Sequence, residues 1–185
     1  MFNANLRRGR RLFAAMLVAA ALLGATFAVA PVARAGGGGC TLVANEHDPS
    51  EKILRCGDSL TVQPAHGTHY RPITKVGQPL PAAIRLDDGA LLIEFHPSPQ
   101  QEDFQILTPL AVAAVRGTKW AMEVSPARTS TLVLAGAVAV TNRRLNQYVI
   151  LREGEGVDIT PSDTTIVQKR WGDARVRALL SRFGQ

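Results

Sequence analysis

The chain has 185 residues, of which 46% are hydrophobic, and carries 21 Lys plus Arg against 15 Asp plus Glu, a formal net charge of +6. This length suffices for one domain with a substantial core. The first 35 residues hold five of the arginines and no acidic residue, so the remainder has a net charge of about +1 and no basic stripe, which argues against a nucleic-acid partner.

The first 35 residues are predicted to be a secretory signal peptide. A basic head precedes an uncharged, Ala-rich apolar run over residues 12–30, and Ala33-Arg34-Ala35 offers the small-x-small site of a signal peptidase. We expect cleavage to leave a mature periplasmic chain that starts at Gly36 and has no second membrane span; an uncleaved membrane anchor is the alternative. Arg10-Arg11-Leu12-Phe13 also fits a twin-arginine signal, so the export route, Sec or twin-arginine, stays open.

Residues 36–39 are four glycines, which we expect to form a flexible spacer before a β-domain over residues 40–170. At the start of that domain, two short apolar stretches flank a polar loop that contains proline, the pattern of a β-hairpin. Cys40 and Cys56 lie at the two ends of this segment and are the only cysteines. In an oxidising compartment we expect them to form a structural disulfide, because a catalytic thiol would want a C-x-x-C motif or a nearby base.

Residues 57–81 are rich in proline and glycine, so we expect turns and loops there, with one short strand at residues 59–62. His66 and His69 lie three residues apart in this part of the chain. A zinc site would need two further ligands, for which the available side chains are His47, Asp48 and His96. Because the spacing is loose and falls in a loop, we expect solvent-exposed histidines, no metal site and no cofactor.

Residues 82–86 and 90–96 are apolar enough for two strands, and Asp87-Asp88-Gly89 lies between them. An Asp-Gly pair between apolar runs predicts a tight hairpin, because its turn needs a positive φ. The paired carboxylates could serve acid–base chemistry or calcium binding. In a tight turn they more often accept hydrogen bonds from their own backbone, so we expect a turn there.

Short apolar runs recur from residue 104 to residue 160, each closed by Gly, Pro, Asn or Asp. None is long enough for a good helix, and Val, Thr and Ile are frequent, which favours strands. The run that contains Trp120 alternates apolar side chains with others, as expected of a strand with one solvated face. The pattern predicts an all-β fold, a β-sandwich or β-roll of short strands, with strands at residues 111–115, 119–124, 131–134, 137–140, 148–151 and 157–159.

Three motifs in this stretch resemble the FecR domain. The first is Val115-Arg116-Gly117-Thr118 followed by Trp120, which is similar to the family's V-R-G-T-x-F/W turn. The second is Val133-Leu134-Ala135-Gly136-Ala137-Val138-Ala139-Val140, similar to its V-L-x-G-x-V-x-V strand pair, and the third is Val149-Ile150-Leu151-Arg152-Glu153-Gly154-Glu155, similar to its closing strand and turn. Together with Leu86-Asp87-Asp88-Gly89-Ala90-Leu91-Leu92, the resemblance covers roughly residues 80–160. It implies a structural role for the motif residues Val115, Arg116, Gly117, Thr118, Trp120, Gly136 and Gly154.

Arg116 is the charged residue of the first motif, and two roles suit it. Its planar guanidinium could hold an anion or the carboxylate of a partner. Alternatively, it ties a neighbouring turn to Gly117, whose missing side chain allows a bulge or a close backbone approach. We expect the structural role, with Asp158 or Glu94 as the acidic partner.

Residues 171–185 change to helical periodicity, with apolar side chains at Trp171, Val176, Leu179, Leu180 and Phe183. Asp173 near the start and Arg182 near the end suit the helix dipole, and Gly184 can end the helix. We expect this short amphipathic helix to pack back on the sheet. Docking to a partner or to a membrane surface is the alternative.

The sequence contains no nucleophile elbow, P-loop, H-E-x-x-H or dinucleotide fingerprint, so we do not expect an enzyme. The resemblance implies a non-enzymatic sensing or binding module. FecR regulators typically add a cytoplasmic sigma-factor-binding segment, and because only eleven residues precede the apolar run, we do not expect this chain to bind a sigma factor by itself. Two functions remain open: a protein-interaction module in envelope signalling or regulation, and a binder of a small ligand or an envelope glycan.

Overall fold

The computed structural model describes residues 39–78, 80–99 and 101–185. The predicted signal peptide and residues 36–38 of the predicted spacer lie outside the described residues. The described chain forms the following elements: β1 (Cys40–Ala44), β2 (Lys52–Cys56), β3 (Leu60–Pro64), β4 (His69–Ile73), β5 (Ala83–Phe95), β6 (Phe104–Leu107), β7 (Ala111–Val115), β8 (Thr118–Ser125), β9 (Arg128–Ala135), β10 (Ala137–Asn142), β11 (Gln147–Arg152), β12 (Glu155–Ile159), β13 (Lys169–Arg170), α1 (Asp173–Leu180) and a 3-10 turn (Ser181–Phe183).

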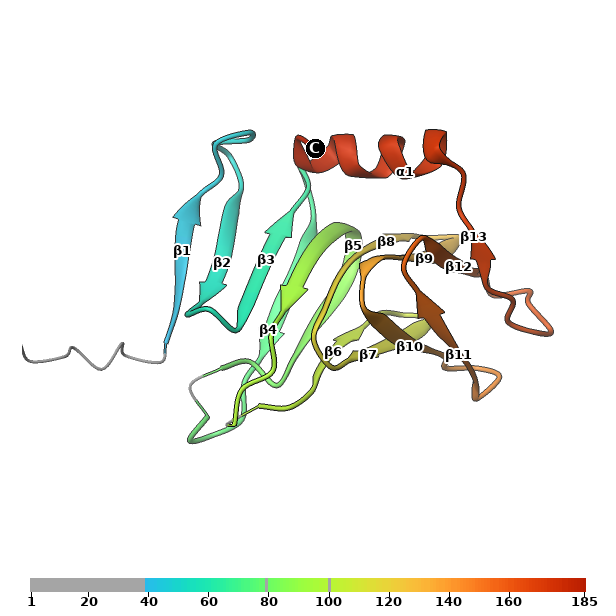
Figure 1. The fold of residues 1–185 in the computed structure, drawn as a ribbon, viewed down its shortest axis with the longest axis horizontal. Coiled ribbons are helices and arrows are strands. Elements are labelled where there is room, and N and C mark those ends of the chain that lie inside the picture. The colour runs from blue at the N-terminus through green and yellow to red at the C-terminus, as the bar shows by residue number, and fades with distance from the viewer. Residues whose placement is uncertain (1–38, 79, 100) are drawn as a thin grey trace, which may run out of the picture. The chain divides into compact units, whose positions relative to one another are not determined.

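The strands form one curled sheet with two ladders that share β5 (Figure 1). The long ladder has the order β1-β2-β3-β5-β8-β9-β12-β13, and the short ladder has the order β4-β5-β6-β7-β10-β11. Neighbouring strands are antiparallel except β5 and β6, which are parallel. Strands make up most of the described chain, so the predicted all-β fold with a short C-terminal helix is confirmed.

Most strands lie where the sequence predicts them. The six strands predicted between residues 104 and 160 are β7 to β12, and the hairpin predicted between the two cysteines is β1 and β2. The sequence does not predict β4 or β6. β4 contains Pro72, which cannot donate a ladder hydrogen bond and is tolerated because β4 lies at the edge of the short ladder. β6 has only four residues, too few for a clear alternation.

The hairpin predicted at Asp87-Asp88-Gly89 is wrong, because one continuous strand, β5, passes through these residues. Gly89 does have the positive φ, 91°, on which the turn prediction depends. The first half of β5 pairs with β4 and β6 in the short ladder, and the second half of β5 pairs with β3 and β8 in the long ladder. Gly89 therefore marks the point at which a strand passes from one ladder to the other.

Thr68 fixes the bend at this point. Its Oγ1 accepts a hydrogen bond from the backbone N–H of Ala90 and donates one to the Ala90 carbonyl oxygen, both at 3.0 Å. A Cβ at Gly89 would lie 2.6 Å from the Thr68 Cα, so a side chain would force the two backbones apart. Asp87 and Asp88 are exposed in the strand, and Asp87 accepts a hydrogen bond from Arg85 Nε at 3.0 Å. The prediction that the acidic pair caps a turn is therefore also wrong.

Alternate residues of the two ladders face each other and form a continuous core. Trp120 is fully buried there, opposite Ile93 and Val133 on the neighbouring strands of the long ladder. Its ring meets the edge of Phe104, from the short ladder, at a centroid distance of 6.5 Å. Phe104 in turn stacks on Phe95 at 5.5 Å. These aromatic contacts join the two ladders through their largest side chains.

The motif glycines lie at corners where the chain passes between ladders. Gly117, Gly136 and Gly154 separate β7 from β8, β9 from β10 and β11 from β12, and each has a positive φ. Two of these corners pack together, because Thr118 Oγ1 donates a hydrogen bond to the Ala137 carbonyl oxygen at 2.9 Å. A Cβ at Gly136 would lie 2.8 Å from the Gly117 carbonyl oxygen. Only glycine satisfies both the backbone angle and the space at this corner.

Cys40 and Cys56 are joined by a disulfide and pair directly in the β1–β2 register. We predict that the Cys40→Ala/Cys56→Ala variant loses about 3 kcal/mol of unfolding free energy, because the cross-link limits the freedom of the unfolded loop. Urea denaturation of the mature chain measures this loss. Thiol titration of unreduced wild-type protein is the control and should find no reactive sulfur; two reactive sulfurs in each chain would contradict the pairing.

The C-terminal helix lies across the outer face of the long ladder (Figure 1). Its segment buries Trp171, Leu179 and Phe183. These side chains pack in an apolar cluster, separate from the interior core, with Ala65, Ala90, Leu92, Ala121 and Leu132. The prediction that the helix packs back on the sheet is confirmed, and Gly184 ends it with a φ of 74°.

Charged residues hold the helix to the same face. The Arg175 guanidinium donates two hydrogen bonds to Asp158 on β12, at 2.8 and 2.6 Å, and Ser130 Oγ donates a third at 2.6 Å. Burial opposes ionisation of Asp158, but the hydrogen bonds from Arg175 and Ser130, together with the charges of Arg175 and Arg128, outweigh it. They hold the pKa of Asp158 below its ordinary value of 3.8.

A lowered pKa makes the contribution of Asp158 depend on pH in a defined direction. We predict that the difference in unfolding free energy between wild type and Asp158→Asn is constant from pH 7 to about pH 5. It should then shrink as the pH falls below about 4. In that range the carboxyl of the unfolded chain takes up a proton while the carboxyl of the folded chain, with its lower pKa, is still charged, so protonation favours the unfolded state. Denaturation curves at successive pH values measure the difference. Arg175→Gln should weaken the same dependence, and a difference that stays constant down to pH 2 would contradict the assignment.

Candidate functional site

The two ladders differ in what lies on their outer faces. α1 covers that of the long ladder, and no helix of the described chain lies on that of the short ladder (Figure 1). On this second face the strand register places one side chain from each strand in a row: Ile73, Ala83, Gln105, Ala114, Ala139 and Ile150. We call the surface around this row the open face.

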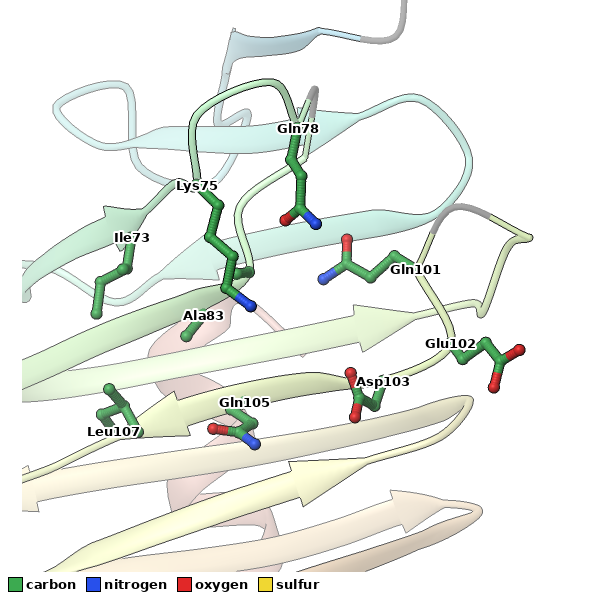
Figure 2. A pocket seen from close by; sticks show the side chains of 10 residues that line it. Ile73, Lys75, Gln78, Ala83, Gln101, Glu102, Asp103, Gln105 and Leu107 are labelled. Atoms are coloured by element: carbon green, nitrogen blue, oxygen red, sulfur yellow. The ribbon is translucent and has the colours of Figure 1, made fainter.

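A pocket of about 390 Å³ lies at the β4 end of the open face. Figure 2 shows how its side chains come from three segments: Lys75 and Gln78 from the loop between β4 and β5, Gln101 and Asp103 from the chain before β6, and the strands themselves beneath. Lys75 and Asp103 enter it from opposite sides. The volume falls within the range of about 300–1,000 Å³ typical of small-molecule sites.

The floor of this pocket is apolar and its rim is polar. Ile73, Ala83 and Leu107 form the floor. Gln101 Nε2 donates a hydrogen bond to the Pro81 carbonyl oxygen at 2.9 Å, which fixes one side of the rim. Four rim side chains make no hydrogen bond or ion pair within the described chain, namely Lys75, Gln78, Asp103 and Gln105, and they are free to bind a ligand.

A shallow apolar patch adjoins the pocket on the open face. Ala114, Ala139 and Ile150 form its centre, and Asp103 lines both the pocket and the patch. Tyr148 and Ile150 project outward from β11 and are 68% and 52% exposed, a large fraction for side chains of this size. Exposed apolar side chains grouped on one face are typical of a binding surface.

Arg116 lies at the rim of this patch, and its predicted ion pairs with Asp158 or Glu94 are wrong. Its guanidinium binds Glu102 at 2.7 Å, because the pairing of Phe104 with Val115 brings the ends of β6 and β7 together. Both side chains are 73% exposed, so this pair contributes little to stability. Asp158 is held by Arg175 at the outer face of the long ladder instead.

The other motif residues shape the fold and line no part of the pocket. Val115 and Trp120 are buried, and the three motif glycines form corners. The pocket residues Lys75, Asp103 and Gln105 carry no sequence signal of their own, because they come from separate loops and one strand that only the fold brings together. Sequence reasoning missed them for that reason.

Ser50, His66 and Asp48 meet where the β1–β2 loop contacts the β3–β4 loop. Ser50 Oγ donates to Asp48 Oδ1 at 2.5 Å, and His66 Nδ1 lies 3.0 Å from Asp48 Oδ2 and 3.4 Å from Ser50 Oγ. The Ser50 hydrogen bond, with His66 nearby, holds the pKa of Asp48 below 3.8. In a catalytic triad serine and carboxylate contact opposite ring nitrogens. Here both contact the same nitrogen, so the group connects two loops without forming a triad.

The same loops bring three metal-ligating side chains together. Asp48, Glu51 and His66 place one ligand atom each within 4.8 Å of one another, but His66 is 81% exposed and its Nδ1 already contacts Asp48. The other histidines considered for zinc are outside this cluster: His47, His69 and His96. The zinc set considered from the sequence is therefore not assembled within the described residues.

The chain resembles known proteins in two comparisons. The model of the family described as FecR protein matches residues 52–139. Two crystal structures of a candidate anti-sigma factor from Parabacteroides distasonis ATCC 8503 share the fold, with TM-scores of 0.55 and 0.53 and 17% sequence identity. Each match covers 78% of this chain and 61% of the other, so this chain spans about three fifths of the length of those proteins. No curated protein matches the sequence.

None of the helices in the described residues is both long and apolar enough to cross a membrane.

Proposed function

Because the model of the FecR protein family matches residues 52–139, we propose that this chain is a non-enzymatic periplasmic module that binds another protein in envelope signalling or regulation. The two structural neighbours are described as a candidate anti-sigma factor, a regulatory class that works through protein partners. A protein partner also suits the open face of this chain.

The open face is the observation that carries this proposal. The molecule covers one outer face with its own helix and leaves Tyr148 and Ile150 exposed on the other, beside the half-buried Ala114 and Ala139. Large side chains at the centre of an interface contribute most of its binding energy, whereas small ones allow close approach. Ile150 and Tyr148, among alanines, are therefore the residues on which we expect a partner to bind.

The proposal is tested by crosslinking in the native host. A photo-crosslinking residue at Ala139 should capture one exported protein, and Ile150→Asp in the same chain should lower the yield about fivefold or more, because a charge replaces a central apolar contact. Leu42→Asp is the matched control, since Leu42 is 65% exposed on β1, away from the open face. Equal loss with both variants, or no discrete adduct, would overturn the proposal.

Export to the periplasm is part of the same proposal. The basic head, the apolar run and the Ala33-Arg34-Ala35 site support cleavage before Gly36, and the Cys40–Cys56 disulfide suits an oxidising compartment. The intact mass of protein from the native host should correspond to a chain that starts at Gly36. Blocking the twin-arginine pathway then distinguishes the two export routes, and a mass that includes Met1 would overturn cleavage.

The pocket in Figure 2 favours a second function, the binding of a small ligand. An envelope glycan suits it less well, because none of the described residues that line the pocket has an aromatic side chain to stack on a sugar ring. A thermal-shift screen of iron chelates, sugars and peptidoglycan fragments tests this alternative. A stabilising compound would support it, and a screen without one would leave the protein partner as the favoured function.

A further inference from the structure

The pocket beside β4 presents opposite charges that are not paired with each other. Lys75 and Asp103 enter it from opposite sides, and neither makes an ion pair within the described chain (Figure 2). The neighbouring carboxylate, Glu102, also lines the pocket but is already bound by Arg116 at 2.7 Å. The pocket therefore offers one ammonium and one carboxylate to a ligand.

Amide side chains line the same pocket as these charges. Gln78 and Gln105 have no hydrogen-bond partner within the described residues, and the amide oxygen of Gln101 is free because only its nitrogen is used. A primary amide both donates and accepts hydrogen bonds, as a peptide group does. Three such groups suit a ligand whose backbone is itself made of amides.

The floor and the size of the pocket restrict the ligand further. Ile73, Ala83 and Leu107 give it an apolar floor that can take one apolar side chain. Its volume of about 390 Å³ lies near the lower end of small-molecule sites. A ligand of this size that carries both charges is a short peptide.

We propose that this pocket binds a short peptide of about three residues with free ends, its carboxylate on Lys75 and its ammonium on Asp103. Both contacts are charge-assisted hydrogen bonds, stronger than those between neutral groups. The amides bind the peptide groups between the ends, and the apolar floor takes the middle side chain. This proposal does not depend on the protein partner at Ile150.

The probe is the tripeptide Ala-Leu-Ala, with the mature chain followed by NMR. Titration should shift the backbone signals of Ile73, Lys75 and Gln105 until they saturate. Because exposed ion pairs contribute modestly, acetylating the amino end or amidating the carboxyl end should each weaken binding about fivefold. Signals that do not shift at millimolar peptide, or capped peptides that bind as tightly as the free one, would overturn the proposal.

Two variants assign the charges to their residues. Lys75→Gln should abolish the difference between the free and amidated peptide, and Asp103→Asn should abolish the difference between the free and acetylated peptide. Lys52→Gln and Asp58→Asn, both exposed outside the pocket, should leave both differences unchanged, and so should Ile150→Asp. If the Lys75 and Asp103 variants still bound the free peptide about fivefold more tightly than the capped peptides, the assignment would be overturned, whatever the crosslinking experiment shows.

Discussion

Replacing Trp120 by alanine should lower the unfolding free energy by about 3–5 kcal/mol, a large part of the 5–15 kcal/mol that a domain usually has. Trp120 is fully buried, and its contact with Phe104 joins the long ladder to the short one. Alanine would leave a cavity between ladders that cannot close without moving Phe104 and, through it, Phe95. Urea denaturation followed by far-UV circular dichroism measures the loss.

Two further variants distinguish the contribution of the buried aromatic ring from that of the indole N–H and from the general effect of removing an aromatic side chain. The Trp120 indole N–H has no hydrogen-bond partner among the described residues, so Trp120→Phe removes an unsatisfied polar group while it keeps an aromatic ring. We expect it to lose less than half of what alanine loses. Tyr148→Ala, an exposed aromatic on β11, is the control and should change stability by about 0.5 kcal/mol or less. The interpretation fails if phenylalanine at position 120 is as damaging as alanine.

The fold was predictable where local pattern and tertiary context agree. From residue 104 onward, the alternation of apolar residues and the glycines between runs specify both the strands and their ends. The pattern misleads at Gly89, since a positive φ serves equally for a tight turn and for a bend within a strand. The choice depends on Thr68, which lies 21 residues away in sequence and holds Ala90 through two hydrogen bonds. A sequence window around Gly89 cannot contain that information.

The candidate site was far less predictable than the fold. The motif around Arg116 predicts a structural corner, and its ion-pair partner, Glu102, depends on the register of β6 against β7. The pocket residues Lys75 and Asp103 lie in two irregular segments whose composition is ordinary for loops. They line one pocket because β5 and β6 run parallel, which requires the crossing chain before β6 to return to the same end of the short ladder.

The exposure of the open face depends on where the C-terminal helix packs. Both ladders have outer faces, and α1 covers the one whose cluster contains Leu92 and Leu132. If the helix left this position, the apolar side chains beneath it would form a second exposed apolar surface, which could bind other molecules as the open face could. The contacts of Trp171 therefore bear on function as well as on stability.

We predict that Trp171→Ala lowers the unfolding free energy by about 3–5 kcal/mol and undocks α1. The ring lies against Gly156 on β12 and Arg175 stacks on it at 3.4 Å, and alanine removes both contacts. The hydrogen bond from the Trp171 backbone N–H to the Gly154 carbonyl oxygen, at 3.0 Å, would remain. Because the cluster under the helix is separate from the interior core, the strands should persist after the helix leaves. Amide hydrogen exchange should therefore accelerate in α1 first.

A second substitution reaches the same contact from the opposite side. Gly156→Ala would place a methyl group in the Trp171 ring and 2.6 Å from the Thr131 carbonyl oxygen, so it should reproduce the faster exchange in α1. Arg177→Ala, on the exposed side of the helix, is the control and should change little. Binding of a hydrophobic dye should rise in the first two variants only, because only they uncover Leu92 and Leu132. Unchanged exchange in α1 after loss of the indole would show that the ion pairs of Arg175 and Arg182, and not the Trp171 ring, hold the helix on the long ladder.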